Sequence, residues 1–241
     1  MNIATYIIAL LLFIPQTYAD DTPMCNSLTE PENKVCLTSI NNIHPTQFVL
    51  GMVSIKDKIK KVEKRYRKKK LNKKLSKKVL PSVLGPDKKV YIMDGHHSSY
   101  ALLKAKIPDN KKILFVEIVK DCSNCSLNDF EDYMTTDGHS YLYNKDFEPM
   151  SFYELPVSLN DLIDNPYRGF AWLLREEECF NKVSVNFLEF IWAKALKKEL
   201  NKLGVYLTDS DEDTLESYID LGCEISHLDQ FRHFPGYVKK D

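Results

Sequence analysis

The first nineteen residues of the chain contain no charged side chain. Their apolar run, residues 7–14, is too short for a membrane span. Small residues, Thr17 and Ala19, occupy the positions that a signal peptidase recognises, although only the terminal amine supplies the usual positive charge. We expect a signal peptide over residues 1–19, cleaved between Ala19 and Asp20, and a secreted or periplasmic protein without a stable membrane span. A buried N-terminal helix is the alternative.

The chain also lacks a second pair of metal ligands beside the C-x-x-C motif that ends at Cys125, so this motif supports a zinc site only weakly. All six cysteines follow the predicted signal peptide, and an even number of cysteines in an exported chain favours disulfides. The pairs that we expect are Cys25 with Cys36, Cys122 with Cys125, and Cys179 with Cys223.

Acidic residues are scarce between Lys56 and Lys89, where sixteen lysine or arginine residues and three acids give a local net charge of +13. The whole chain has a net charge of −1, so the charges are strongly segregated. A segment of this charge density attracts polyanions such as nucleic acid, an anionic membrane surface or an acidic polysaccharide. A solvated helix face is the alternative. The residues that we expect to contact nucleic acid are Lys61, Lys64, Arg65 and Lys68.

Periodicity and turn residues predict a compact α/β unit in the first half of the chain. The predicted elements are a short strand, a turn and a second strand or helix start at 43–55, one long basic helix at 56–78, a strand broken by proline at 77–84, a strand at 90–93, a helix at 100–106 and a buried strand at 113–119.

The second half reads as loops followed by helices. Residues 121–158 are predicted to be loop-rich, with short aromatic strands at 141–143 and a hairpin turn at 137–140. An amphipathic helix is expected over residues 187–203, packed on the core. The acids at 209–213 suggest a calcium loop, but Thr214 replaces the glycine of such a loop. We expect these acids to begin a helix instead.

The segment Asp94-Gly95-His96-His97-Ser98-Ser99 is the main candidate for function. It lies between the strand at 90–93 and a helix, and a strand that turns through glycine into a helix directs free N–H groups at one point. We expect this turn to bind phosphate. The expected phosphate-binding residues are Gly95, Ser98, Ser99 and, from a later segment, Arg168.

The side chains of this turn can also move protons or bind a metal ion. Asp94 is a candidate catalytic base and the ligand of a divalent ion, Mg²⁺ or Mn²⁺. His96 and His97 are the other candidate catalytic residues, one of them as a general acid. The alternative is that Asp94 caps the helix and the histidines only line the turn. Arg175 lies seven residues after Arg168, so both face one side of a helix, toward phosphate or in ion pairs.

Several blocks of sequence together resemble the ParB-like nuclease family over roughly residues 40–200. These blocks are Pro45-Thr46-Gln47 with Gly51, the Asp94-Gly95-His96-His97 turn with its strand, residues 165–172 and residues 187–193. The resemblance implies the ParB/sulfiredoxin fold, which is α+β with a small mixed-sheet core, here followed by a C-terminal helical extension. We divide the chain into residues 1–19 (signal peptide), 20–40 (lead-in), 41–125 (ParB/sulfiredoxin-like domain) and 126–241 (loop-rich and helical extension).

The resemblance does not fix the reaction, because proteins of this fold act differently on phosphates. Sulfiredoxin-like chemistry needs a cysteine in the turn, and DNA-partitioning relatives carry a helix-turn-helix domain, which this sequence lacks. The free serine kinases share the D-G-H-H turn but use an upstream acid, which residues 52–55 do not offer. The sequence therefore favours a nuclease or phosphodiesterase. A non-catalytic binder of nucleic acid or another polyanion is the alternative, and an ATP-dependent small-molecule kinase is the third possibility.

Overall fold

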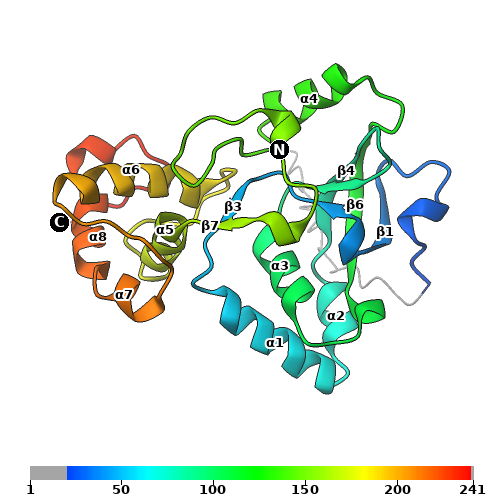
Figure 1. Ribbon diagram of the computed structural model, residues 1–241, viewed down its shortest axis with the longest axis horizontal. Helices are drawn as coiled ribbons and strands as arrows, with labels where there is room; N and C mark the ends of the chain where they lie inside the picture. Colours follow the sequence, from blue (N-terminus) through cyan, green and yellow to red (C-terminus); the bar gives the residue numbers. More distant parts are fainter. Residues whose placement is uncertain (1–20, 240–241) are drawn as a thin grey trace, which may run out of the picture.

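A mixed five-stranded sheet forms one end of the molecule (Figure 1). The computed structural model describes residues 21–239, so the predicted signal peptide and its cleavage site lie outside the described residues. The strands are β1 (Lys34–Ser39), β2 (Ile43–His44), β4 (Leu80–Leu84), β5 (Val90–Ile92) and β6 (Ile113–Asp121), and their order in the sheet is β1-β6-β4-β5-β2. β6 is rich in buried apolar residues because β1 pairs with one of its edges and β4 with the other. Together with the helices, this sheet confirms the predicted α+β class.

Three helices pack beside the sheet: α1 (Ile55–Arg67), α2 (Leu71–Leu75) and α3 (His96–Lys104). The prediction of one helix over residues 56–78 was wrong, because the chain turns between α1 and α2. Lys69 lies in the left-handed region with a φ of 54°, and its N–H donates to the Tyr66 carbonyl (2.8 Å). Three consecutive lysines offer no apolar anchor at this point, whereas Leu71 is buried in the core and redirects the chain.

The prediction that proline breaks the strand at 77–84 was also wrong. Pro81 is the second residue of β4, and its carbonyl accepts a hydrogen bond from the N–H of Met93 (2.9 Å). The missing N–H of a proline removes only one ladder donor. The pairing of β4 with β6 shifts after Ser82, which lets the strand continue. β4 therefore lies between β5 and β6 and carries its N-terminal end to the start of α3.

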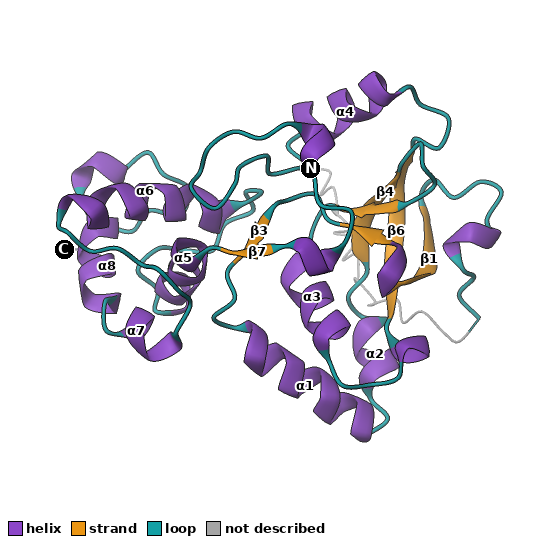
Figure 2. Ribbon diagram, in the orientation of Figure 1, coloured by secondary structure: helices purple, strands orange, loops and turns teal. Residues whose placement is uncertain are grey.

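Helices dominate the other end of the molecule (Figure 2). They are α5 (Pro166–Glu176), α6 (Leu188–Lys202), α7 (Glu212–Glu216) and α8 (Ile219–Ser226), and they share a second core around Trp192. The predicted amphipathic helix corresponds to α6. The Asp211 side chain caps α7 by accepting from the Thr214 N–H (3.0 Å), as expected for acids that begin a helix.

One helix, α4 (Leu127–Thr136), lies in the stretch that was predicted to be loop-rich. Ser126 caps its first turn, and Phe130 and Met134 are buried four residues apart. The predicted hairpin turn at 137–140 is instead the turn that ends α4, with Gly138 in the left-handed region and its N–H on the Thr135 carbonyl. The helix was missed because only these two buried residues mark its apolar side.

All three predicted disulfides are present: Cys25–Cys36, Cys122–Cys125 and Cys179–Cys223. The Cys179–Cys223 disulfide links the segment directly after α5 to α8. Within residues 21–239, none of the helices has the length and apolar character that a bilayer crossing requires. Three disulfides are compatible with an extracellular protein, because such bonds persist in oxidising compartments.

The two ends of the molecule meet at a close backbone contact. A Cβ atom on Gly51 would lie 2.5 Å from the backbone nitrogen of Gly169, so only a glycine fits here. Beside this contact β3 (Val49–Leu50) pairs with β7 (Ile163–Asp164), and the Asp164 carboxylate accepts from the Met52 N–H (3.0 Å). These contacts fix α5 against the α/β part, next to the turn at Asp94.

Candidate functional site

The turn from β5 into α3 has the geometry of an anion-binding site. Gly95 precedes the first helical residue with a φ of 82°, and a Cβ atom on it would lie 2.6 Å from the Leu80 side chain. The first N–H groups of a helix have no intrahelical partner, and none of the described side chains caps α3. The alternative in which Asp94 caps the helix is therefore not what the structure shows. The N–H groups of this first turn and the positive end of the helix dipole border a cavity that residues 94–98 line.

The two histidines of the turn are hydrogen-bond acceptors. The Nε2 atom of His96 accepts from the Thr46 N–H (3.0 Å), and the Nε2 atom of His97 accepts from the Gly51 N–H (3.2 Å). Burial lowers the pKa of His96 to about 4, and burial followed by the charge of Arg168 lowers the pKa of His97 well below its usual value. Both imidazoles are therefore neutral at pH 7. They hold the segment 46–51 against α3.

Lys78 lies beside the turn, just before β4. Its Nζ donates to the Ser98 hydroxyl (2.8 Å), which in turn donates to the Gly95 carbonyl (3.0 Å). Burial lowers the pKa of Lys78, and the nearby Asp94 carboxylate opposes this shift. The ammonium group is thus held at the first turn of α3, close to the one acidic side chain of the turn.

A second lysine, Lys58, approaches from the first turn of α1. Its Nζ donates to the Ser54 hydroxyl and lies 5.0 Å from the centre of the Trp172 ring. Burial, and then the charges of Arg168 and Lys61, lower the pKa of Lys58 to about 8. A lysine that loses part of its proton affinity through burial and like charges gains stability from a bound anion.

Arg168 comes from the first turn of α5 and is only 8% exposed. Its Nε atom has no hydrogen-bond partner among the described residues. One Nη atom is 3.5 Å from the Glu189 carboxylate, which also pairs with Arg175. The guanidinium group lies 5.2 Å from the centre of the Phe190 ring. The two arginines thus share one side of the helix, as their spacing predicted, and share one carboxylate.

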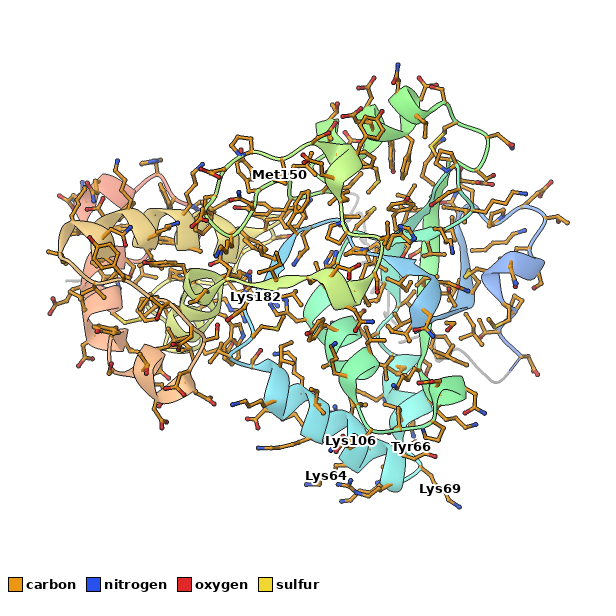
Figure 3. The ribbon with its side chains drawn as sticks, in the orientation of Figure 1. Lys64, Tyr66, Lys69, Lys106, Met150 and Lys182 are labelled. Carbon is orange, nitrogen blue, oxygen red and sulfur yellow. A yellow bond between two sulfur atoms is a disulfide. The ribbon has the colours of Figure 1, made fainter. Side chains whose placement is uncertain are left out.

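These groups line one cavity of about 520 Å³ between the two ends of the molecule. Its charged lining residues are Lys58, Lys78, Asp94, Arg168, Arg175, Lys182 and Glu189. Five positive charges face two negative ones, so the cavity attracts anions. Lys182 enters from the segment between α5 and α6, and Figure 3 shows it near the boundary of the two ends.

The predicted site residues divide into three groups. Asp94, Gly95, His96, His97, Ser98 and Arg168 all line this cavity. Ser99 does not: its hydroxyl is fully buried and has no hydrogen-bond partner among the described residues. The four predicted nucleic-acid contacts lie outside the cavity, three of them on α1 and Lys68 directly after it, with Lys61, Lys64 and Lys68 exposed. Figure 3 shows Lys64 toward the far end of α1.

Sequence reasoning missed Lys58, Lys78, Lys182 and Glu189. The first two belong to the basic segment, but their positions at the cavity depend on how α1 and β4 meet the turn. The position of Lys78 could have been predicted from the sequence. Two antiparallel strands joined by the turn at residues 85–87 bring the start of the first strand, which Lys78 precedes, next to the end of the second. Lys182 and Glu189 carried no comparable signal.

The expected divalent ion can be tested against the donors present. Among residues 21–239, no three acidic, histidine or cysteine side chains are grouped so that they could hold a metal ion. Asp94 faces Lys78, and the other carboxylate of the cavity, Glu189, is paired with two arginines. This donor set does not fit a resident magnesium or manganese ion.

Comparisons with known proteins show the fold and the family of the chain. The crystal structure of protein Atu1540 from Agrobacterium tumefaciens is similar, with a TM-score of 0.70 and 23% sequence identity, and the match covers 86% of this chain and 100% of that chain. This likeness shows the fold. No match was found among curated proteins. Residues 36–198 match the model of the family described as "Putative ParB-like nuclease". The chain therefore belongs to the ParB-like nuclease family.

Proposed function

We propose that the cavity at the start of α3 binds a phosphate group of a nucleic acid and that the protein is an exported phosphodiesterase. The observation that carries this proposal is that Lys58, Lys78 and Arg168 line the same cavity as the N-terminal turn of α3. The family match supports nuclease chemistry. The three disulfides and the uncharged first nineteen residues support export.

Arg168 supplies the most specific argument for phosphate. Its buried Nε–H lacks a partner among the described residues, and an unsatisfied donor on a charged group is costly. A phosphate oxygen would satisfy this donor, while Lys78 and the first N–H groups of α3 would bind the other oxygens. Arginine and helix N-termini are both common phosphate ligands in proteins.

The same groups can assist hydrolysis. Asp94 would accept a proton from a water molecule whose oxygen attacks the phosphorus atom. The bond from phosphorus to the leaving oxygen would break, and the Nζ of Lys58 would protonate that oxygen, since a pKa of about 8 suits proton donation near neutral pH. Arg168 and Lys78 would stabilise the charge that develops on the phosphate oxygens. The neutral histidines would position the turn.

The proposal is tested by cleavage of labelled single- and double-stranded DNA and RNA, with magnesium, with manganese and with EDTA. We expect the mature wild-type protein to cleave at least one of these substrates, and Asp94→Asn to reduce the rate by about 10²-fold or more, as for a lost proton acceptor. Lys106→Gln removes one positive charge at an exposed site outside the cavity and should leave the rate unchanged.

The second candidate function is binding without catalysis, and the exposed basic residues of α1 favour it. In that case the wild type would bind nucleic acid in a salt-dependent way but would cleave none of these substrates under any of the three conditions. This result would contradict the phosphodiesterase and leave the phosphate-binding cavity in place.

A further inference from the structure

A second cavity of about 520 Å³ shares Phe190 with the first. We infer that it is a subsite for an unpaired nucleobase, so that the polyanion bound by this protein is single-stranded nucleic acid. This inference rests on the proposed function, because it names the substrate class of the same site. Its lining differs in kind from that of the first cavity, since aromatic rings take the place of most of the charges.

The walls of this second cavity combine rings with lysines. Tyr141, Tyr143 and Phe234 line it, together with Lys194 and Lys198 of α6. Tyr143 is half-buried, and the Nζ of Lys194 lies 4.9 Å from the centre of its ring. The acid in this lining, Glu199, is paired with Lys202 (2.8 Å). The rings therefore face the cavity beside a positive rim.

The two cavities are joined by a continuous series of contacts. Phe190 lines both of them. The Arg168 guanidinium lies against one part of this ring, 5.2 Å from its centre, and Tyr141 stacks on it with a centroid distance of 4.1 Å. Tyr143 follows at 5.0 Å from Tyr141. A ligand that places a phosphate at Arg168 can therefore extend across this aromatic wall.

A nucleobase suits this arrangement better than a purely apolar group. Bases stack on aromatic side chains, and the phosphates of the same strand need positive charges near by, which the lysines supply. A base in a duplex is already stacked and paired, so it cannot enter a cavity without being flipped out. The combination of rings and lysines is characteristic of proteins that bind single strands.

The test uses a twelve-nucleotide oligothymidylate, an abasic strand of equal length, and the duplex of the first strand with its complement, each titrated by calorimetry. One stacked base contributes about 1–3 kcal/mol, so the wild type should bind the oligothymidylate about 5- to 150-fold more tightly than the abasic strand. Tyr143→Ala should remove most of this difference and leave the affinities for the abasic strand and for the duplex unchanged.

Two control variants complete the design. Tyr143→Phe keeps the ring and should retain the preference for bases, which separates stacking from a loss of fold. Tyr206→Ala removes a tyrosine that is 65% exposed and lines neither cavity, and it should bind all three ligands as the wild type does.

Equal affinity of the wild type for the oligothymidylate and the abasic strand would overturn the subsite while leaving phosphate binding intact. An equal loss for all three ligands in Tyr143→Ala would also overturn it. Failure of the wild type to bind any of the three ligands would instead refute the proposed function, and the subsite with it.

Discussion

At the scale of single residues, the histidines of the turn have a structural explanation that their sequence context did not suggest. Two adjacent histidines after Asp94 predicted proton chemistry, but each Nε2 atom already accepts a backbone hydrogen bond from the segment 46–51. A buried imidazole that accepts in this way must stay neutral. The sequence shows which residue types are present, whereas their partners depend on contacts across about fifty positions of the chain.

The neutral histidines predict a loss of stability in acid. The pKa of His96 is lowered to about 4 in the folded protein, so between pH 6.5 and 4 the unfolded chain binds a proton that the folded chain does not. The free energy of unfolding should therefore fall as the pH falls through this range, by on the order of 3 kcal/mol from His96. Urea unfolding at several pH values measures this change.

Two variants separate this effect from the protonation of carboxylates. His96→Gln keeps an acceptor for the Thr46 N–H but cannot be protonated, so its stability should decline less steeply between pH 6.5 and 4. His233→Gln changes an exposed histidine and should keep the wild-type slope. Identical slopes of unfolding free energy against pH for all three proteins would contradict the lowered pKa of His96.

Lys58 predicts a pH dependence of a different kind. Its pKa of about 8 in the free protein means that its positive charge is lost above this pH. Binding of inorganic phosphate should weaken as the pH rises from 8 to 10, by at most tenfold per pH unit for one proton. Lys58→Arg should move the decline to higher pH, because arginine stays charged. A wild-type affinity that is constant from pH 7 to 10 would exclude Lys58 from the site.

At the scale of secondary-structure elements, α1 serves two regions of the surface. Its first turn places Lys58 in the cavity, whereas Lys61 and Lys64 lie on its exposed side and the exposed Lys68 follows its last residue. Charges on such a side can gather a polyanion without touching the reacting phosphate. The basic segment was predicted to be one helix. It forms two, and of these only α1 contributes a residue, Lys58, to the cavity lining.

This arrangement predicts that α1 contributes to nucleic-acid affinity through salt-dependent contacts. The double variant Lys64→Gln/Lys68→Gln should weaken the binding of a twelve-nucleotide strand and reduce the slope of log K against log salt by about 1.4, or 0.7 for each lost contact. Its affinity for inorganic phosphate should not change, since neither residue lines the cavity. Fluorescence anisotropy at several salt concentrations gives the slope. An unchanged slope would mean that Lys64 and Lys68 are only solvated and make no contact with the strand.

At the scale of the whole molecule, local sequence patterns predicted the fold class and the turn, but they did not predict the cavity that long-range contacts form. The α+β class, the strand–turn–helix at Asp94 and the three disulfides followed from motifs and from cysteine spacing. The cavity did not, because it forms where two ends of the molecule meet at Gly51 and Gly169. A sequence pattern does not reveal that Glu189 pairs with both arginines or that Phe190 lines two cavities.

The disulfides predict a graded response to their removal. Cys179–Cys223 closes a segment with a sequence separation of 44, whereas Cys122–Cys125 has a separation of 3. Loop-closure entropy predicts a loss of about 4 kcal/mol for Cys179→Ala/Cys223→Ala and about 2 kcal/mol for Cys122→Ala/Cys125→Ala. Urea unfolding of both double variants measures these losses. A larger loss for the short bridge would show that packing around the sulfur atoms, rather than chain entropy, decides the order.

The central claim is that the cavity at the start of α3 binds phosphate. A phosphorus NMR titration of the protein with inorganic phosphate tests it most directly, because neither the exposed lysines Lys61, Lys64 and Lys68 nor the second cavity contributes. We predict one saturable site in the wild type, about tenfold or more weaker affinity in Lys78→Gln because a charge-assisted hydrogen bond is lost, and wild-type affinity in Lys106→Gln. No saturable site in the wild type, or equal affinities in Lys78→Gln and Lys106→Gln, would contradict the account.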